Sequence, residues 1–205
     1  MDKKEVFVDI SARHIHLTQE HVDILFGEKD YQLHVHRELA GGGGFSAQEQ
    51  VQVIGPRNSF PKVRILGPCR KESQVELSKT DARTIGIDAP IRLSGDLAGT
   101  PGCKVVGPAG EIELDHGVII AKRHIHMGDK TCADWGFKHG DVVAVKVETP
   151  DRTIIFGDTE IRMAAGPGEW AGKVEMALMH IDTDEANAGG MPGPMKGYIV
   201  SIDKE

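Results

Sequence analysis

The tetrapeptide Arg-His-Ile-His occurs twice in this sequence, at residues 13–16 and again at residues 123–126. Successive side chains of a β-strand point to opposite faces, so the two histidines of each H-x-H pair lie on the same face. Imidazole is the commonest protein ligand for zinc and related metals. A single pair would be weak evidence, because it also suits a solvent-facing strand. The repeat predicts two related substructures that each offer part of a metal site.

A second repeated pattern surrounds these pairs. A residue that can bind metal is followed by an apolar residue, a residue suited to capping, a short helical stretch and a glycine. The four occurrences place His16, Glu76, His126 and His180 at equivalent positions. Packing alone gives no reason to choose these residue types, so we expect a pseudo-symmetric core whose ligands converge on one site. The helical stretches should end at Gly27, Gly86, Gly136 and the pair Gly189 and Gly190.

Composition restricts the class of protein. The chain has 205 residues, which suits one large domain or two small ones. Its net charge of −7 argues against a nucleic-acid or anionic-membrane partner. The three cysteines form no C-x-x-C motif, so neither a disulfide framework nor a zinc ribbon is expected. The chain lacks an apolar stretch of membrane-spanning length and a signal-peptide pattern, which predicts a cytoplasmic protein.

Short apolar segments between glycines and prolines dominate the chain, and their spacing favours barrels or sandwiches. The clearest helix is expected over Gln19–Phe26, with Thr18 as its N-cap. A third H-x-H pair, His34 and His36, lacks the following cap and helix, so we expect it to be structural or solvent-facing. The glycine-rich stretch 41–44 predicts a mobile hairpin tip, and residues 163–173 predict an inserted loop. Strands are expected at 5–10, 32–36, 50–54, 62–66, 74–77, 91–94, 111–114, 117–121, 142–148, 153–162, 173–179 and 198–202.

The candidate ligands are five histidines and one carboxylate, a suitable number for two metal ions. A set without sulfur suits zinc, with cobalt, nickel or iron as alternatives. Arg13 and Arg123 should point away from the histidine face and brace the strand ends. Arg70 follows a Gly-Pro turn six residues before Glu76 and offers bidentate hydrogen bonds to phosphate. This combination indicates phosphoryl or acyl-phosphate chemistry. No G-x-S-x-G motif suggests covalent catalysis by a serine.

Several longer segments together resemble one known family, the phosphotransacylases of the PduL type, also called phosphate propanoyltransferases. The resemblance covers nearly the whole chain. It implies reversible transfer of a short acyl group, propanoyl or acetyl, between coenzyme A and phosphate. It also implies a mainly β fold of two small β-barrels capped by short α-helices, with a dinuclear zinc site between them. The matching segments are VDISARHIHL at 8–17, QVE at 74–76, TDAR at 80–83, GI at 86–87, Pro90, RLSG at 92–95, AKRHIHM at 121–127 and MHIDTDEANA at 179–188.

The resemblance also assigns roles to individual residues, and these agree with the repeated pattern. Two Zn²⁺ per chain are expected, although other divalent metals would suit the donors. The first barrel would comprise 1–12 and 122–205, and the second 13–121 with an excursion at about 27–48. One zinc would be held by His14, His16 and Glu76 and the other by His124, His126 and His180; Arg70 would bind phosphate; Ser11, Arg64, Leu66 and Asn187 would contact coenzyme A, which is a substrate.

Some features depart from the family pattern. Members found inside bacterial microcompartments usually carry an N-terminal amphipathic peptide, and here the first strand begins by Glu5, which favours a free cytoplasmic enzyme. The glycine run at 41–44 and the loop at 163–173 are unusual, so the shape of the acyl and coenzyme A pocket is open. A homo-oligomer with small-molecule substrates is expected. Two alternatives remain: a dinuclear metal hydrolase of a phosphoester or thioester, and a metal-binding structural module.

Overall fold

The computed structural model describes residues 3–39, 44–163 and 177–201. Contacts between residues divide the chain into two compact units. Unit 1 contains the described residues among 1–11 and 122–205, and unit 2 contains residues 12–39 and 44–121. The chain therefore passes from unit 1 to unit 2 after its first strand, and returns after Ala121.

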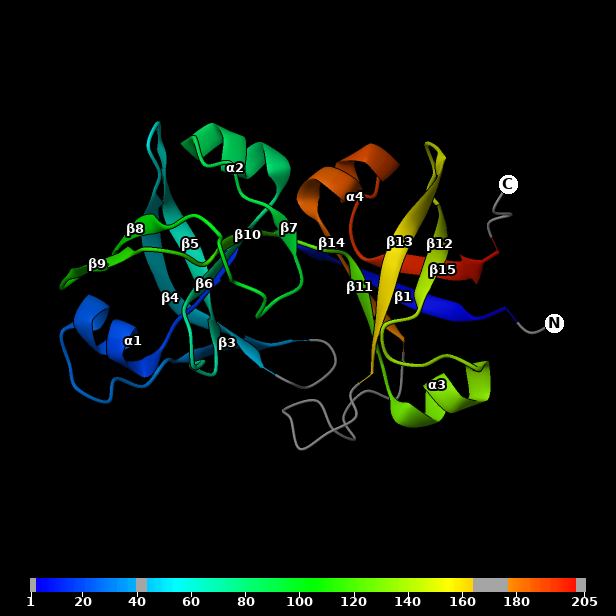
Figure 1. The fold of residues 1–205 in the computed structure, drawn as a ribbon, viewed down its shortest axis with the longest axis horizontal. Helices are drawn as coiled ribbons and strands as arrows, with labels where there is room; N and C mark the ends of the chain where they lie inside the picture. The colour runs from blue at the N-terminus through cyan, green and yellow to red at the C-terminus, as the bar shows by residue number, and fades with distance from the viewer. Residues whose placement is uncertain (1–2, 40–43, 164–176, 202–205) are drawn as a thin grey trace. The chain divides into compact units, whose positions relative to one another are not determined.

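Unit 1 is a closed β-barrel (Figure 1). Successive side chains along its strands alternate between the core and the outer face. Ile125, Ile161 and Met179 are fully buried among the apolar side chains of the barrel. Neighbours of these residues along each strand therefore point to the outer face. The helices of the unit are α3 (Asp129–Trp135) and α4 (Thr183–Gly189). In order around the barrel the strands are β1 (Glu5–Ser11), β14 (Leu178–Asp182), β11 (His124–Met127), β13 (Thr153–Met163), β12 (Val142–Glu148) and β15 (Met195–Val200).

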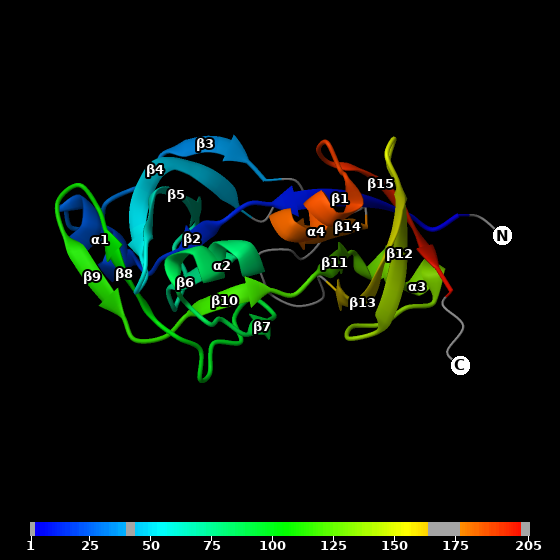
Figure 2. The same cartoon turned by 90° about the horizontal axis from the view of Figure 1, so that it is seen from above.

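Unit 2 is built on one sheet with α1 (Gln19–Phe26) and α2 (Lys79–Ile85). Its core contains Ile15, Ile65 and Val75, which alternate with outward-facing polar residues. Figure 2 shows a strongly curved β4 with β3 along its edge. No strand pairing closes this sheet within the described residues. The strands run in the order β7 (Ile91–Arg92), β10 (Val118–Ala121), β6 (Gln74–Leu77), β2 (His14–His16), β5 (Ser59–Gly67), β4 (Phe45–Ile54), β8 (Cys103–Val106) and β9 (Glu111–Leu114), and β3 (Val35–Glu38) pairs with β4.

The predicted helix signals are confirmed at both ends of the helices. Thr18, Ser78 and Asp182 each accept a backbone hydrogen bond as N-caps, whereas Gly128 begins α3 without a side-chain cap. Every helix ends at a left-handed glycine, a conformation that costs a residue with a Cβ atom about 1 kcal/mol or more. These glycines are Gly27, Gly86, Gly136 and Gly190, with φ of 75°, 81°, 75° and 66°.

The mainly β class is confirmed, but several strand positions differ from prediction. The strand predicted at 32–36 lies at Val35–Glu38, because the Glu49 carboxylate binds the backbone N–H of His34. The strand predicted at 91–94 is only two residues long, and β8 was not predicted. The strand predicted at 198–202 begins at Met195, where it pairs with Val8. The strand predicted at 173–179 begins at Leu178 among described residues. Residues 41–43 and most of the predicted 163–173 loop lie outside those residues.

Among the described residues, no helix is both long enough and apolar enough to cross a membrane.

Candidate metal centres

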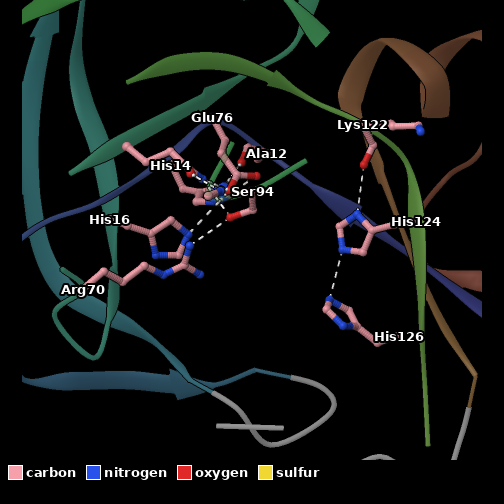
Figure 3. A network of polar contacts seen from close by, with 11 residues as sticks. Ala12, His14, His16, Arg70, Glu76, Ser94, Lys122, His124 and His126 are labelled. Atoms are coloured by element: carbon pink, nitrogen blue, oxygen red, sulfur yellow. Dashed lines mark hydrogen bonds and ion pairs between the residues drawn. The ribbon is translucent and has the colours of Figure 1, made fainter. Parts of the chain in front are cut away.

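The first cluster of candidate ligands lies in unit 2 (Figure 3). His14 and His16 come from β2, and Glu76 comes from the adjacent antiparallel strand β6. His14 and Glu76 are direct partners in the strand register, which places all three side chains on one face. The His14 Nε2 atom lies 3.4 Å from Glu76 Oε2, and His16 Nε2 lies 3.7 Å from Glu76 Oε1. All three residues are buried.

The second cluster lies in unit 1. His124 and His126 come from β11, and His180 comes from the adjacent antiparallel strand β14. His124 and His180 are direct register partners, as His14 and Glu76 are in unit 2. The Nε2 atoms of His124 and His126 are 3.0 Å apart. In each cluster the candidate ligand atoms all lie within 4.8 Å of one another.

The two clusters are built on the same strand pattern. In each unit the H-x-H strand has a parallel neighbour on one side and an antiparallel neighbour on the other. The antiparallel neighbour supplies the third residue, which lies two positions before the N-cap of the next helix. His16 and His126 also lie two positions before an N-cap. The predicted equivalence of the four units is therefore confirmed, while their convergence on one dinuclear site stays a prediction.

Backbone carbonyls set the tautomers of the first histidine in each pair. His14 Nδ1 contacts the Ala12 carbonyl at 2.9 Å, and His124 Nδ1 contacts the Lys122 carbonyl at 2.9 Å (Figure 3). A carbonyl only accepts hydrogen bonds, so each Nδ1 carries a proton and donates it. In the neutral ring the Nε2 atom is then the nitrogen that carries the lone pair, and it faces the other candidate ligands of its cluster. This is the usual arrangement of a metal-binding histidine.

Electrostatics in unit 2 favour an ionised carboxylate beside a neutral imidazole. Burial alone would raise the pKa of Glu76, but His14, His16 and Arg70 lower it well below its ordinary value. Burial, and then His14 and Arg70, hold the pKa of His16 well below its usual range. Burial lowers the pKa of His14, but the Glu76 carboxylate outweighs this effect and raises it. A cation at this cluster would therefore compete with protonation of His14.

The residues of both clusters fit a metal ion. A tetrahedral ion with bonds of about 2.0–2.1 Å needs neighbouring donor atoms about 3.3 Å apart. The contacts of 3.0, 3.4 and 3.7 Å lie on either side of that value. Three protein ligands without sulfur are typical of catalytic zinc sites, which keep one position for water or substrate.

Arg70 lies beside the unit 2 cluster, as Figure 3 shows. Its backbone N–H donates to the Leu17 carbonyl at 2.8 Å, and its Nη1 atom donates to Ser94 Oγ at 2.9 Å. The guanidinium is half-buried and contributes to the lowered pKa of both His16 and Glu76. The structure thus brings the Arg70 guanidinium next to the unit 2 cluster, a position suited to binding an anionic substrate.

The arginines that precede the histidine pairs point away from the clusters, as predicted. Arg13 lies 4.2 Å from the Phe60 ring centroid, and its Nε is 3.5 Å from an Asp81 carboxylate oxygen. Arg123 donates to the Glu185 carboxylate at 2.5 Å and to the Gly157 carbonyl at 2.6 Å. Asp81 and Glu185 lie in the first turns of α2 and α4. Each arginine thus connects the H-x-H strand to the helix that follows the third ligand.

The predicted coenzyme A contacts fall in both units. Arg64 and Leu66 are two positions apart on β5, and Arg64 is the register partner of His14, so both lie on the face of the unit 2 cluster. Arg64 Nη1 donates to the Ala47 carbonyl at 2.9 Å. In unit 1, Ser11 ends β1 and Asn187 is an exposed residue of α4. Their contact with coenzyme A stays a prediction.

Sequence reasoning gave no role to Gln74 or Ser94. Gln74 is 1% exposed and donates from Nε2 to Glu76 Oε1 and to Ser94 Oγ. Both residues lie in segments that resemble the family. Gln74 also lies two residues before Glu76 on the same predicted strand, so the sequence could have indicated that it points to the same face. The third histidine pair lies outside the clusters, as expected: His34 is exposed and contacts the Glu49 carboxylate at 2.7 Å.

Sequence comparison with known proteins identifies one family. The sequence model of the family described as phosphate propanoyltransferase matches residues 7–192. A phosphate propanoyltransferase of Thermotoga maritima is 47% identical over 198 residues, which cover 96% of this chain and 90% of that protein. One from Salmonella typhimurium is 43% identical, with coverage of 95% and 88%. One from Leptotrichia buccalis is 45% identical, with coverage of 97% and 90%.

Proposed function

Because the chain belongs to the phosphate propanoyltransferase family and is therefore an acyltransferase, we propose that it converts a short-chain acyl-CoA and phosphate to acyl phosphate and coenzyme A. Propanoyl-CoA and acetyl-CoA are the proposed substrates, and the reaction is reversible. The observation that carries this proposal is the pair of register-matched ligand clusters, one of which has Arg70 beside it.

We propose that His14, His16 and Glu76 hold one divalent ion, and that His124, His126 and His180 hold another. Zinc suits these donors best. When bound, such ions would act as Lewis acids toward the thioester carbonyl and would stabilise a thiolate leaving group. Five of these ligands are buried, all except the half-buried His180, and burial favours the neutral form of His16.

Arg70 is the proposed phosphate-binding residue. Its guanidinium can form two parallel hydrogen bonds to a phosphate, and its contact with Ser94 fixes one end of the side chain. Holding phosphate against the thioester carbon would allow direct attack, with no acyl-enzyme. Orientation of the two substrates supplies much of the rate acceleration in reactions of this kind.

Coenzyme A is proposed to contact Arg64 and Leu66 beside the unit 2 cluster, together with Ser11 and Asn187 of unit 1. The support is the position of Arg64 and Leu66 on β5, next to the H-x-H strand. A guanidinium at that position would attract the phosphate groups of the cofactor.

The first experiment is to measure release of the free coenzyme A thiol from propanoyl-CoA and acetyl-CoA on metal-replete protein. We expect release that depends on inorganic phosphate and produces acyl phosphate. Release without phosphate would instead support the metal hydrolase. If neither thioester reacted, a metal-binding module would be the better description.

Two variants test the assigned roles. Arg70→Met should keep full metal content but lower kcat/KM for phosphate by about 100-fold, as expected for loss of a charge-stabilising group. Arg37→Met, on the exposed strand β3, is the matched control and should leave the kinetics unchanged. Unchanged phosphate kinetics in Arg70→Met would remove that residue from the proposal. His124→Gln should abolish activity and release one equivalent of metal.

A further inference from the structure

A buried amide connects the carboxylate ligand to the phosphate-binding arginine in unit 2. Gln74 lies two residues before Glu76 on β6, so both side chains point to the same face. Its Nε2 atom donates to Glu76 Oε1 at 2.5 Å and to Ser94 Oγ at 2.8 Å. Its Oε1 atom accepts from the Gly95 backbone N–H at 2.7 Å. Ser94 Oγ also accepts from Arg70, which completes the connection.

Chemistry fixes the orientation of this amide. The Gly95 N–H can only donate, so it must face the oxygen of Gln74. The amide nitrogen is thereby turned toward Glu76 Oε1, which accepts from it. Both amide hydrogens and the oxygen are therefore used, and rotating the amide by 180° would turn its oxygen toward Glu76 Oε1 and its N–H groups toward the Gly95 N–H. A buried amide whose donors and acceptor are all used holds its partners rigidly.

The equivalent position in unit 1 shows that this amide is not required by the strand pattern. Gln74 is the register partner of His16, and Leu178 is the register partner of His126. Both positions are buried, yet unit 1 uses an apolar side chain. The third ligand of that unit is His180, whose imidazole has no carboxylate oxygens that an amide could orient. The amide thus occurs in the unit whose third ligand is a carboxylate.

We infer that Gln74 is a positioning residue for the unit 2 metal site, an inference that rests on the proposed function. By binding Oε1, it holds the Glu76 carboxylate with Oε2 turned toward His14. Through Ser94 it also sets the position of the Arg70 guanidinium. Ligand and phosphate-binding residue are thereby held in one geometry before substrate arrives. Outer hydrogen bonds of this type typically change metal affinity by 10- to 100-fold.

The test compares zinc affinity in variants of a His124→Gln background, in which only the unit 2 site should remain. Gln74→Met removes the amide while keeping a similar length and volume, and Gln74→Asn keeps an amide that is one methylene too short. Gln52→Leu is the control. Gln52 lies on β4, and its Nε2 atom makes a comparable hydrogen bond to Ser59 Oγ on β5 at 3.0 Å. Zinc affinity is measured by competition with a chromogenic chelator, and unfolding of metal-free protein reports on folding.

We expect Gln74→Met and Gln74→Asn to lose 10- to 100-fold in zinc affinity, and Gln52→Leu to lose less than twofold. Zinc affinity in both Gln74 variants equal to that of the control would overturn the inference and leave the proposed function intact. If the protein without substitutions bound no zinc, the proposed metal sites and this inference would both fail. If Gln74→Met did not fold, the zinc affinity of Gln74→Asn would still test the inference.

Discussion

The ion pair between Arg123 and Glu185 should stabilise unit 1 and keep the candidate metal ligands of that unit in position. Arg123 precedes His124 directly, and Glu185 lies in the helix that follows His180. Glu185 also accepts from the Asp182 backbone N–H at 3.0 Å, as part of a capping box. Breaking the pair would therefore loosen the connection between the two strands that carry the candidate ligands.

The structure gives the expected size of the effect. The Arg123 and Glu185 side chains are 28% and 19% exposed, and their charged groups are 2.5 Å apart. A hydrogen bond between charged groups contributes about 1.5–3 kcal/mol, and partial exposure favours the lower end. We expect a coupling energy of about 1.5 kcal/mol. Arg123→Met alone should cost about 3 kcal/mol, because the bond to the Gly157 carbonyl is lost as well.

A double-mutant cycle of Arg123→Met and Glu185→Gln measures this coupling by urea unfolding of metal-free protein. Glutamine at this position keeps the capping box, so the cycle isolates the ion pair. The equivalent cycle with Arg13 and Asp81 is the control. That pair is 3.5 Å apart, and its coupling should stay below about 1 kcal/mol. A coupling near zero for Arg123 and Glu185 would refute the bracing role.

Two further predictions concern helix ends and pH. Gly27 and Gly136 both have φ of 75°, but a Cβ at Gly27 would lie 2.8 Å from the Ala109 Cβ, whereas at Gly136 it would meet nothing within 4 Å. Thermal unfolding should therefore show a cost of about 1 kcal/mol for Gly136→Ala and about 2 kcal/mol or more for Gly27→Ala. Burial opposes ionisation of Glu49, but its hydrogen bonds with His34 prevail and lower the pKa of Glu49. Its contribution is thus present above the unfolded pKa and lost as pH falls through the folded one. Glu49→Gln should cost about 1 kcal/mol at pH 7, and this cost should disappear once the pH falls below the lowered pKa of Glu49; an equal cost under both conditions would contradict this assignment.

The sequence predicted the candidate ligands because their signal is local. Each lies on a short strand with a fixed parity and two positions before a helix N-cap, and both features are visible in the residues themselves. His16 and His180 could therefore be placed without knowledge of how the chain folds. The helix ends were predicted for the same reason, since a left-handed glycine is a local requirement.

What the sequence did not predict depends on contacts between distant residues. The strand predicted at 32–36 moved because Glu49, which is far along the chain, binds the backbone of His34. The role of Gln74 depends on Ser94 and Gly95, twenty and twenty-one positions away. A short strand such as Cys103–Val106 is stabilised by its neighbours in the sheet, so its own residues give little indication of it.

The equivalence of the two clusters makes a last prediction, in which unit 2 receives the residues of unit 1. Glu76→His gives unit 2 three histidines, but it leaves the buried Gln74 amide without its carboxylate acceptor. An unsatisfied buried donor costs about 1–3 kcal/mol. Adding Gln74→Leu reproduces the Leu178 and His180 pair of unit 1 and removes that cost, while in either background it leaves the Gly95 N–H without the oxygen of Gln74.

The double variant should therefore be about 1–2 kcal/mol more stable than the sum of the two single substitutions predicts, in urea unfolding of metal-free protein. It should also bind zinc with three histidines, as unit 1 is proposed to do. Gln74→Leu alone should destabilise, because it removes a partner from Glu76. The size of its effect thus depends on the residue at position 76. If Gln74→Leu had the same effect with Glu76 and with Glu76→His, the amide and the carboxylate would contribute to stability independently. The equivalence in strand register would then have no effect on stability.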